Sequence, residues 1–554
     1  MSGGRTRIAA VRAGSLAAIR VLIFHGYLLR GTGSNVYNAS LAQALARMGH
    51  DVHLLCQDRR AASLPWVDDF VDLRDGARAP QDAPQGGESG GGDGQTVGSG
   101  SITVYVPDIG GLLPVFVLDR YEGFEVKTFP QLTDGELAGY IDANVSAVRE
   151  VVQSLGGVDA AVASHLVMGP VVLARAGLRC ALKVHGSDLS YAVLPHLGRF
   201  RPYALEAAAN ATAVLVSTAH VAARLRRAVE EPWVEEKLRL APPGVDAELF
   251  SPISREEAGP RLRELAAELG SGGGESVTQT PAPADSWRRD DAQAAAAIEH
   301  LAQGRGPRIV FVGKLIVSKG VDLLLAAWPL VCAQHPDARL LIVGFGAYEG
   351  GLDRLWSALT RGDLAEAQRV AQLGRGLEGG EERPLRILGS FLAEPPRGYL
   401  ESARRAGLTV SFSGRLEHDE VGRLLPVADA LVFPSTFPEA FGMVAAEAAA
   451  AGVLPISADH SGAAEVSRAL AEALPPQARG LVSFPIDAGA VEAIGDRLNR
   501  WLGLAPGIRE GARAALHQAA VRLWSWESVA RAVLDAAAGR VDELPRVPPS
   551  DGCR

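Results

Sequence analysis

Short apolar runs alternate with longer stretches of helical periodicity along most of the chain. The first runs are "RVLIF" and "DVHLLC", and the stretch "SNVYNASLAQALARMGH" between them has the spacing of an amphipathic helix. Three further runs, "DAAVAS", "ALKVH" and "TAVLVS", follow at wider spacing. This alternation is typical of a doubly wound parallel sheet, so we predict an α/β domain over residues 19–250.

The same alternation starts again near residue 308. The segments "RIVFVG", "GVDLLLAAWPLVCAQHP" and "ARLLIVGFG" are continued by "LTVSFSG", "DALVFPS", "GVLPIS" and "GLVSF". A chain of 554 residues exceeds what one hydrophobic core usually organises, so two domains are expected. We predict a second α/β domain over residues 308–520.

The other segments differ in composition. Two tracts, "DAPQGGESGGGDGQTVGSGS" and "LGSGGGESVTQTPAPADSWRRDD", are rich in Gly, Ser, Pro and charge and are expected to be flexible, because they can bury little apolar surface. The predicted divisions are an N-terminal arm (1–18), a Gly-rich insertion (76–101), a helical and flexible linker (251–307), a helical insertion (361–406), a C-terminal helix (521–540) and a tail (541–554).

Charge and cysteine content narrow the classes of function. The 55 Lys and Arg residues against 64 Asp and Glu give a net charge of −9, which argues against nucleic acid as the main partner. The four cysteines lack Cys-x-x-Cys spacing, so a zinc site and a disulfide framework are not expected, and a reducing cytoplasm fits best. Neither a signal peptide nor a transmembrane segment is expected.

Two glutamates, Glu439 and Glu447, stand in an alanine-rich run after the apolar strand "ALVF". The run from about Ala440 to Ala451 predicts a helix that begins beside Glu439. On a continuous helix the two Cα atoms would lie about 12 Å apart, whereas paired carboxylates of glycoside hydrolases lie roughly 5–9.5 Å apart. We therefore interpret the pair as clamps for hydroxyl groups at the two ends of an elongated ligand. The free amides of "AFGM" (440–443) would suit a phosphate.

Further candidates lie in loops that follow predicted strands. Gly313, Lys314 and Lys319 precede a helix, at the edge where parallel sheets bind ligands, and the two lysines would neutralise a diphosphate. Gly33, in "RGTGSN", would allow an anion close to the backbone. This loop lacks the third glycine of Gly-x-Gly-x-x-Gly, which disfavours a nicotinamide cofactor. His185, in "KVHGSD", is a candidate polar contact.

Each candidate also has a purely structural interpretation. Glu439 would be a favourable charge at a helix N-terminus, surface lysines often have no function, and a lone histidine is often a structural residue. The apolar neighbours of Glu447 distinguish it, since a buried carboxylate needs a partner. The sequence has no Asp-x-Asp and no His-Glu-x-x-His, which weakens metal-dependent transfer and zinc hydrolysis, respectively.

Taken in order, these segments resemble the retaining glycosyltransferases of family 4, which have the GT-B architecture. The matching segments are "RGTGSN", "KVHGSD", "APPGVDAELFSP", "FVGKLIVSKGVDLLLAAWPLV", "VSFSGRLEHDEVGRLLPVADALVFPS" and "FPEAFGMVAAEAAAAGVLPISADHSGAAE". The Glu-x7-Glu element is the most specific of them. The resemblance implies an α/β fold with two Rossmann-like doubly wound domains that face a central cleft. It also implies a terminal helix, within 521–540, that crosses back to the first domain.

The resemblance also implies roles for individual residues. Glu447 would bind ribose hydroxyls and Glu439 the transferred sugar, while Lys319 would neutralise the leaving diphosphate. Lys314 stands where the family more often has Arg, so a point-charge contact is expected there. The residues expected at the donor are Gly33, Gly313, Lys314, Lys319, Arg415, Leu416, Glu439, Ala440, Phe441, Gly442, Met443 and Glu447, and those expected to act in catalysis are Glu439, Lys319 and His185.

We therefore expect a cytoplasmic, metal-independent glycosyltransferase that moves a sugar, with retention, from a nucleotide diphosphate sugar. No cofactor and no nucleic acid partner are expected. The acceptor would be a small molecule, a glycan or a lipid-linked compound, the last of which would bring the protein to a membrane surface. The alternatives are an epimerase or phosphorylase of the same architecture and a non-catalytic nucleotide-sugar-binding protein. A nucleotide-dependent oxidoreductase is disfavoured, because the loop "RGTGSN" lacks the Gly-x-Gly-x-x-Gly fingerprint of dinucleotide binding.

Overall fold

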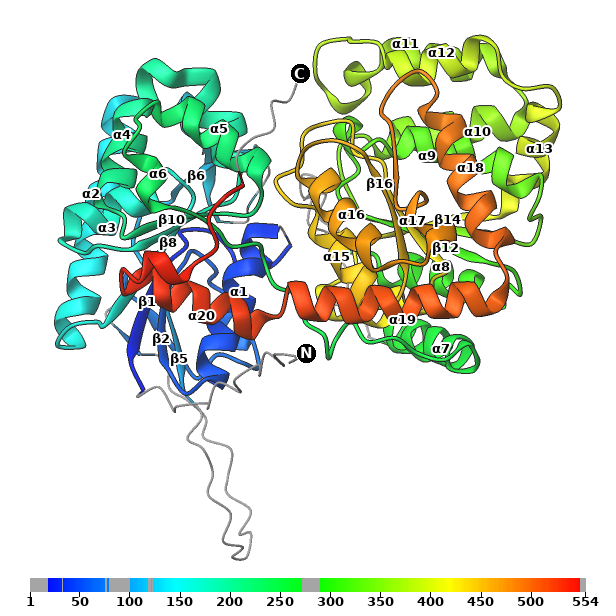
Figure 1. The fold of residues 1–554 in the computed structure, drawn as a ribbon. Coiled ribbons are helices and arrows are strands. Elements are labelled where there is room, and N and C mark those ends of the chain that lie inside the picture. Colours follow the sequence, from blue (N-terminus) through cyan, green and yellow to red (C-terminus); the bar gives the residue numbers. More distant parts are fainter. Residues whose placement is uncertain are drawn as a thin grey trace, which may run out of the picture.

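The computed structural model describes residues 18–31, 33–74, 77–78, 100–117, 121, 123–271 and 289–548. These residues form two α/β domains that lie side by side in Figure 1. The arm predicted over 1–18 and the Gly-rich insertion predicted over 76–101 lie almost entirely outside the described residues.

The N-terminal domain is built on one sheet with the strand order β11-β10-β9-β8-β1-β2-β5-β3-β4. Neighbouring strands are parallel except for β3 and β4. Two further strands, β6 and β7, pair in parallel beside it. The bounds are β1 Arg20–Phe24, β2 Asp51–Leu55, β3 Asp69–Asp72, β4 Ala77–Arg78, β5 Ile102–Val106, β6 Leu112–Val115, β7 Glu125–Thr128, β8 Ala160–Ser164, β9 Ala181–Val184, β10 Ala213–Val216 and β11 Leu238–Leu240.

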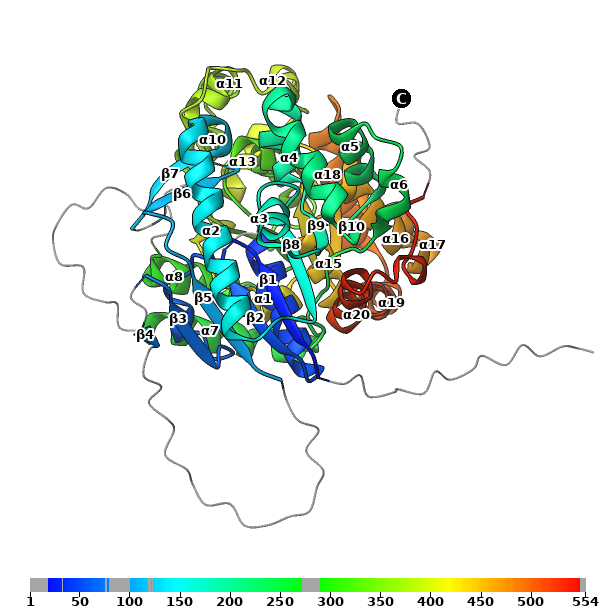
Figure 2. The ribbon, with the colours of Figure 1, turned by 90° about the vertical axis from the view of Figure 1, so that its left-hand side faces the viewer.

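Helices cover both faces of this sheet, because successive side chains of each strand point to opposite faces. In β1, Leu22 and Phe24 join the core under α2–α5, whereas Val21 and Ile23 join the core under α1 and α20. Figure 2 shows these helices against the sheet. The helices are α1 Gly33–Arg47, α2 Asp134–Ser154, α3 Gly169–Ala176, α4 Leu197–Asn210, α5 Ala219–Val229, α6 Val234–Lys237 and α20 Trp526–Ala537.

The C-terminal domain has a fully parallel sheet with the strand order β14-β13-β12-β15-β16-β17. Its strands are β12 Arg308–Val312, β13 Arg339–Val343, β14 Val410–Gly414, β15 Ala430–Phe433, β16 Leu454–Ala458 and β17 Ser483–Phe484. Its helices are α7 Arg255–Ser271, α8 Asp291–Gln303, α9 Val321–Cys332, α10 Glu349–Arg361, α11 Leu364–Leu373, α12 Arg386–Ala393, α13 Tyr399–Arg405, α14 His418–Leu424, α15 Met443–Ala450, α16 Ser461–Ala473, α17 Pro476–Arg479, α18 Ala490–Gly503 and α19 Pro506–Leu523.

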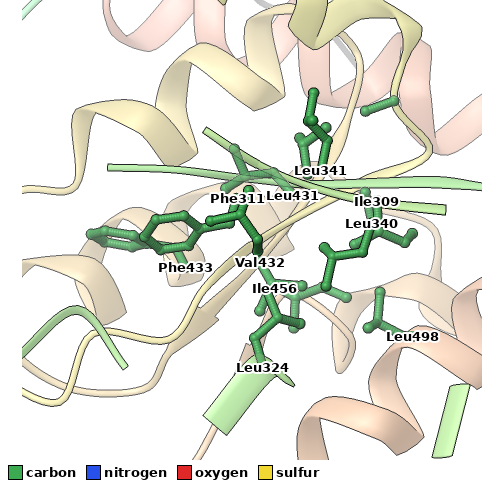
Figure 3. Packing of buried hydrophobic residues seen from close by; sticks show 14 of the residues in the cluster. Ile309, Phe311, Leu324, Leu340, Leu341, Leu431, Val432, Phe433, Ile456 and Leu498 are labelled. Atoms are coloured by element: carbon green, nitrogen blue, oxygen red, sulfur yellow. The ribbon is translucent and has the colours of Figure 1, made fainter. Parts of the chain in front are cut away.

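The central strands of this second sheet are apolar on both faces, as a sheet covered by helices requires. Figure 3 shows side chains of β12, β13, β15 and β16 packed with Leu324 of α9 and Leu498 of α18, all of them buried. Burial of one such side chain stabilises the fold by about 1.5–3 kcal/mol. The core therefore holds the strand ends, and the loops that follow them, in fixed positions.

The segment predicted as a linker, 251–307, supplies two helices to the second domain. Helices α7 and α8 pack on each other, and α8 lies beside β14. Leu262 of α7 and Ile298 of α8 are fully buried in the core of the C-terminal domain. The chain therefore enters the second domain soon after β11, and residues 272–288 of this segment lie outside the described residues.

The two crossings between the domains lie next to each other. The amide of Val245, on the outgoing segment, donates a hydrogen bond of 2.6 Å to the carbonyl of Trp524, on the return. Helix α19 is followed in the chain by α20, which packs on α1 of the first domain (Figure 1). A Cβ on Gly244 would lie 2.5 Å from the ring of Trp526, so glycine allows the crossings to pack closely. No helix in the described part of the chain is long and apolar enough to cross a membrane.

Candidate active site

Two loops of the C-terminal domain, one after β12 and one after β15, are bound to each other. The amide of Thr436 donates a 2.8 Å hydrogen bond to the carbonyl of Ser318. Gly320 has a left-handed backbone (φ +67°), and a Cβ there would lie only 2.0 Å from the carbonyl oxygen of Pro434. Only glycine fits this position without strain. The contact therefore fixes the turn that carries Lys319 against the loop that carries Glu439.

Lys319 and Glu439 form an ion pair between these loops. Lys319 Nζ lies 2.6 Å from Glu439 Oε1, and the side chains are 24% and 18% exposed, so both remain accessible to a ligand. The hydroxyl of Ser435 donates to the same carboxylate oxygen at 2.6 Å, and the amide of Glu439 donates to Ser461 Oγ at 2.8 Å. The sequence predicted both residues as site residues, and the structure brings them together.

Glu439 does not lie at the start of the helix that the alanine-rich run predicts. Helix α15 begins at Met443, because Gly442 adopts a left-handed conformation (φ +100°) that ends any helical continuation toward the N-terminus. Glu439 is therefore part of an extended loop, and the spacing of about 12 Å for a continuous helix does not apply to this pair.

The loop between Glu439 and α15 contacts the first domain. Thr218 Oγ1 donates a 2.9 Å hydrogen bond to the carbonyl of Ala440. A Cβ on Gly186, next to His185, would lie 2.9 Å from Cβ of Ala440, and a Cβ on Gly33 would lie 3.6 Å from Sδ of Met443. Two predicted site regions of the first domain, around Gly33 and His185, thus meet the predicted donor loop of the second.

Glu447 is buried on α15, with 7% of its surface exposed. Its Oε1 lies 3.0 Å from Nε2 of His418, the first residue of α14. Burial lowers the pKa of His418, but the hydrogen bond and the charge of Glu447 outweigh this, and the net result is a raised pKa. The sequence showed that Glu447 needs a partner but did not identify it. The signal was His418 itself, which stands two residues after Leu416 in "RLEHDE" (415–420).

Four further predicted residues lie just after β12 and β14. Arg415 Nη2 pairs with Glu417 Oε1 at 2.6 Å, and Leu416 is buried. The amide of Gly313 donates to the carbonyl of Val343 at 3.0 Å. Lys314 Nζ lies 5.9 Å from the centre of the Phe345 ring. These residues therefore line up along the carboxyl edge formed by β12, β13 and β14.

His185 lies at the end of β9 in a buried cluster of polar side chains. Its Nε2 is 3.2 Å from Ser164 Oγ, and its ring lies edge-on to Tyr37 at 4.9 Å. Burial, followed by the charges of His165, Lys183 and His25, holds the pKa of His185 well below its usual value. The imidazole is therefore neutral at physiological pH and serves as a hydrogen-bonding group, not as a cation.

Lys183, two residues before His185, was not among the predicted site residues. It is fully buried, donates a hydrogen bond to Ser217 Oγ at 3.1 Å and another to the carbonyl of Ala241, and lies 5.3 Å from the centre of the Tyr37 ring. Burial lowers the pKa of Lys183 to about 7. A single charged residue inside the apolar run "ALKVH" was the available signal.

Further contacts hold the two domains together around the pair of loops. Both carboxylate oxygens of Glu465, on α16, accept hydrogen bonds from the first amides of α5, Ala219 N at 2.8 Å and His220 N at 2.9 Å. The rings of Tyr191 and Phe437 stack at 5.8 Å, although both side chains remain more than a third exposed. The site is therefore composite, with groups from both domains.

The second domain matches a known sequence family. Two family models, both described as "Glycosyl transferases group 1", match this domain. They cover residues 306–375 and residues 381–506. These stretches contain both loops of the Lys319–Glu439 pair. The two matches together cover most of the C-terminal domain.

Curated proteins with similar sequences match over part of their length. The GDP-mannose-dependent monoacylated alpha-(1-6)-phosphatidylinositol monomannoside mannosyltransferase of Corynebacterium glutamicum is 31% identical over 228 residues, 40% of this chain and 44% of that protein. A glycogen synthase of Mycobacterium tuberculosis is 28% identical over 249 residues, 44% of this chain and 46% of that protein. The chain thus spans less than half the length of these relatives.

Solved structures with the same fold cover nearly the whole chain. A glycosyltransferase from Rickettsia africae and the catalytic domain of Starch Synthase IV from Arabidopsis thaliana, bound to ADP and acarbose, each superpose with a TM-score of 0.52 at 12% identity, over 95% of this chain and 100% of theirs. Anabaena Alr3699/HepE, in complex with UDP and glucose, gives 0.51 at 14% identity, over 94% and 99%. The fold is GT-B, as the sequence resemblance implied.

Proposed function

We propose that this protein is a retaining glycosyltransferase of the family 4 type, which transfers a sugar from a nucleotide diphosphate sugar to an acceptor. The observation that carries the proposal is the pair Lys319–Glu439, joined at 2.6 Å between two loops at the carboxyl edge of the second sheet. A GT-B fold and a group 1 domain surround this pair. A partly exposed cation and carboxylate at such an edge are suited to a diphosphate and to sugar hydroxyls, respectively.

Binding of the sugar donor would replace the ion pair between Lys319 and Glu439 with contacts from each residue to the donor. Without a ligand, Glu439 supplies the negative charge next to Lys319. In the complex, a donor phosphate would take that position, and the carboxylate of Glu439 would accept hydrogen bonds from the sugar. The amides of Gly442, just before α15, and of Met443, its first residue, would add donors for the sugar and its phosphates. Glu447 would accept from the ribose, with His418 behind it.

The transfer step itself would need no protein base. The bond between the anomeric carbon and the phosphate oxygen breaks, and the diphosphate leaves with the electron pair. The acceptor oxygen bonds to the same face of the sugar, and its proton passes to the leaving phosphate. Lys319 would stabilise the negative charge that develops on the diphosphate, which is a large source of rate enhancement in such sites. His185, held neutral by burial, would act as a hydrogen-bonding group beside the reacting sugar.

The reaction is proposed to be independent of metal ions, because Lys319 supplies the cationic charge that a diphosphate requires. It is proposed to take place in the cytoplasm. The acceptor would be a small molecule, a glycan or a lipid-linked compound. The two relatives named above act, by their names, on a phosphatidylinositol monomannoside and in glycogen synthesis, and we propose one of these acceptor classes for this chain.

A donor screen followed by two variants tests this function. Melting temperatures would be measured with UDP-, GDP- and ADP-sugars, since a ligand at a hundred times its Kd adds about 2.7 kcal/mol of stability. With the stabilising donor, hydrolysis and transfer would be measured, with and without EDTA, for wild type, Lys319→Ala and Glu439→Gln. We expect both variants to lose roughly a hundredfold or more in kcat/KM.

Lys127→Ala is the matched control, because Lys127 also pairs with a carboxylate, that of Glu136, but in the first domain and away from both loops. Wild-type turnover in both site variants would overturn the assigned roles. Tight donor binding without product from any acceptor would instead identify a binding protein. Formation of a sugar phosphate from a glycan and inorganic phosphate would identify a phosphorylase, and an epimerised donor would identify an epimerase.

A further inference from the structure

A helical insertion in the second domain reaches the loop that carries Lys319. Helices α11, α12 and α13 follow α10 and precede β14 in the chain, and α11 and α12 lie at the top of this domain in Figure 1. Between α11 and α12, residues Arg375–Glu378 form a single 3₁₀ turn. Residues 376–380 fall between the two stretches that match the glycosyl transferase family. Glu378 therefore lies outside both family matches, whereas Arg375 is the last residue of the first match.

Glu378 of this turn binds the backbone of the Lys319 loop directly. Its Oε2 accepts a 2.8 Å hydrogen bond from the amide of Val317, the first residue of the 3₁₀ turn Val317–Lys319. The amide of Gly320 closes the same turn by donating to the carbonyl of Val317 at 3.1 Å. Only 10% of the Glu378 side chain is exposed, so this contact is shielded from water. The insertion therefore holds the start of the turn on which Lys319 stands.

The other oxygen of Glu378 is neutralised within the insertion. Arg375 Nε donates to Glu378 Oε1 at 3.0 Å, and the Arg375 side chain is half exposed. Oε1 of Glu378 thus pairs with a cation, and Oε2 accepts from an amide of the loop that carries Lys319. A carboxylate left without such a cation would be unfavourable beside a diphosphate, because like charges repel at short range.

The surroundings of Glu378 are already acidic. Burial raises the pKa of Asp322, in the first turn of α9, to about 7, and the charge of Glu378 contributes to this increase. The charges of Arg375 and Glu378 also act on Tyr191 of the first domain. The turn therefore lies within electrostatic range of the Lys319 loop and of the facing domain.

We propose that Glu378 is a positioning residue for the donor diphosphate and that Arg375 makes this carboxylate compatible with the bound anion. Glu378 fixes the Val317 amide and, through it, the turn that presents Lys319. Arg375 cancels the charge of Glu378. This inference rests on the proposed function, because it assumes that the Lys319 loop binds a diphosphate.

Four variants separate positioning from charge: Glu378→Ala, Glu378→Gln, Arg375→Ala and the double variant Arg375→Ala/Glu378→Gln. Affinity for inorganic pyrophosphate, UDP, GDP and ADP would be measured by calorimetry, and KM and kcat with the active donor. Glu378→Ala removes the hydrogen bond to Val317, so we expect affinity to fall about tenfold. Glu378→Gln keeps an acceptor for that amide and should bind at least as tightly as wild type.

Arg375→Ala leaves the Glu378 charge without its cation, so diphosphate affinity should fall about threefold to fivefold. The double variant should regain wild-type affinity, because the charge that required neutralisation is gone. A purely structural role would instead lower the melting temperature of both single alanine variants and leave affinity, KM and kcat unchanged. Arg369→Ala is the matched control, since Arg369 pairs with Glu366 in the same insertion.

The measurements distinguish failure of this inference from failure of the proposed function. Weakened pyrophosphate binding in Glu378→Ala, with recovery in the double variant, supports the inference even if no transfer is detected. Active transfer with equal diphosphate affinity in all variants would overturn it and leave the proposed function intact. A wild-type protein that binds none of the four anions would overturn both.

Discussion

His418 and Glu447 meet at 3.0 Å between the start of α14 and the middle of α15. The carboxylate is almost entirely buried, whereas about a third of the histidine side chain (35%) is exposed. The histidine therefore connects the buried carboxylate to the surface, and its protonation determines whether the contact is a neutral hydrogen bond or an ion pair.

Removal of this histidine should destabilise the second domain. In His418→Ala the carboxylate of Glu447 loses its partner, and we expect the free energy of unfolding to fall by about 1–3 kcal/mol. Because the pKa of His418 is raised in the folded state, its contribution is largest below its unfolded pKa and is lost as the pH rises through the folded value. Urea unfolding at pH 6 and pH 8.5 should therefore show the larger loss at pH 6. An equal loss at both values would contradict the ion pair.

Asp322 should make stability decrease as the pH rises. Burial raises its pKa to about 7 in the folded protein, so the folded state binds a proton more tightly than the unfolded chain. The stabilisation is present at pH 4 and is lost by about pH 8, a change of up to about 4 kcal/mol. Asp322→Asn should remove this part of the pH dependence and be more stable than wild type at pH 8. Urea unfolding curves of both proteins from pH 4 to pH 8 measure this change in the free energy of unfolding.

Glu465 should hold the two domains in the arrangement described here. Its carboxylate caps α5 of the first domain from α16 of the second, through hydrogen bonds of 2.8 and 2.9 Å. Glu465→Ala should lower stability by about 1 kcal/mol. We also expect a larger radius of gyration in X-ray scattering without ligand, because one contact between the domains is gone. Glu472→Ala, an exposed residue of the same helix, is the control and should change neither quantity.

Gly320 should tolerate no side chain. It combines a left-handed backbone with a Cβ position 2.0 Å from the carbonyl of Pro434. Gly320→Ala should cost at least about 2 kcal/mol and, because the loops of Lys319 and Glu439 are displaced, should also weaken donor binding. Gly511→Ala, on α19 with open space around it, should instead stabilise by about 0.5–1 kcal/mol. Melting temperatures and donor KM for both variants provide the measurement.

Several features of the fold and of this site could be predicted from the sequence, because they depend on the pattern of apolar and polar residues over short stretches. Apolar runs separated by amphipathic stretches predicted two parallel sheets, since strand and helix periodicities are local properties. Lys319 and Gly33 were identified because each follows a strand that the pattern predicts. Chain order alone placed them at carboxyl edges, where α/β proteins bind ligands.

Other features could not be predicted from the sequence, because they depend on contacts between residues that are far apart in the chain. The run after Glu439 has high helix propensity, yet Gly442 takes a left-handed conformation against Phe433, and the helix starts later than predicted. Helices α7 and α8 looked like a linker because the tract between them is polar. Their apolar faces are covered only once the second sheet exists.

By itself the sequence determined that there are two α/β domains, that lysines follow the first strand of the second, and that a carboxylate on an alanine-rich helix needs a partner. Only the tertiary structure decided which partners meet: Lys319 with Glu439, Glu447 with His418, and Glu378 with the amide of Val317. The reason is physical. Periodicity is encoded over a few neighbouring residues, whereas an ion pair forms only when the packed cores bring separate strand ends to within hydrogen-bonding distance.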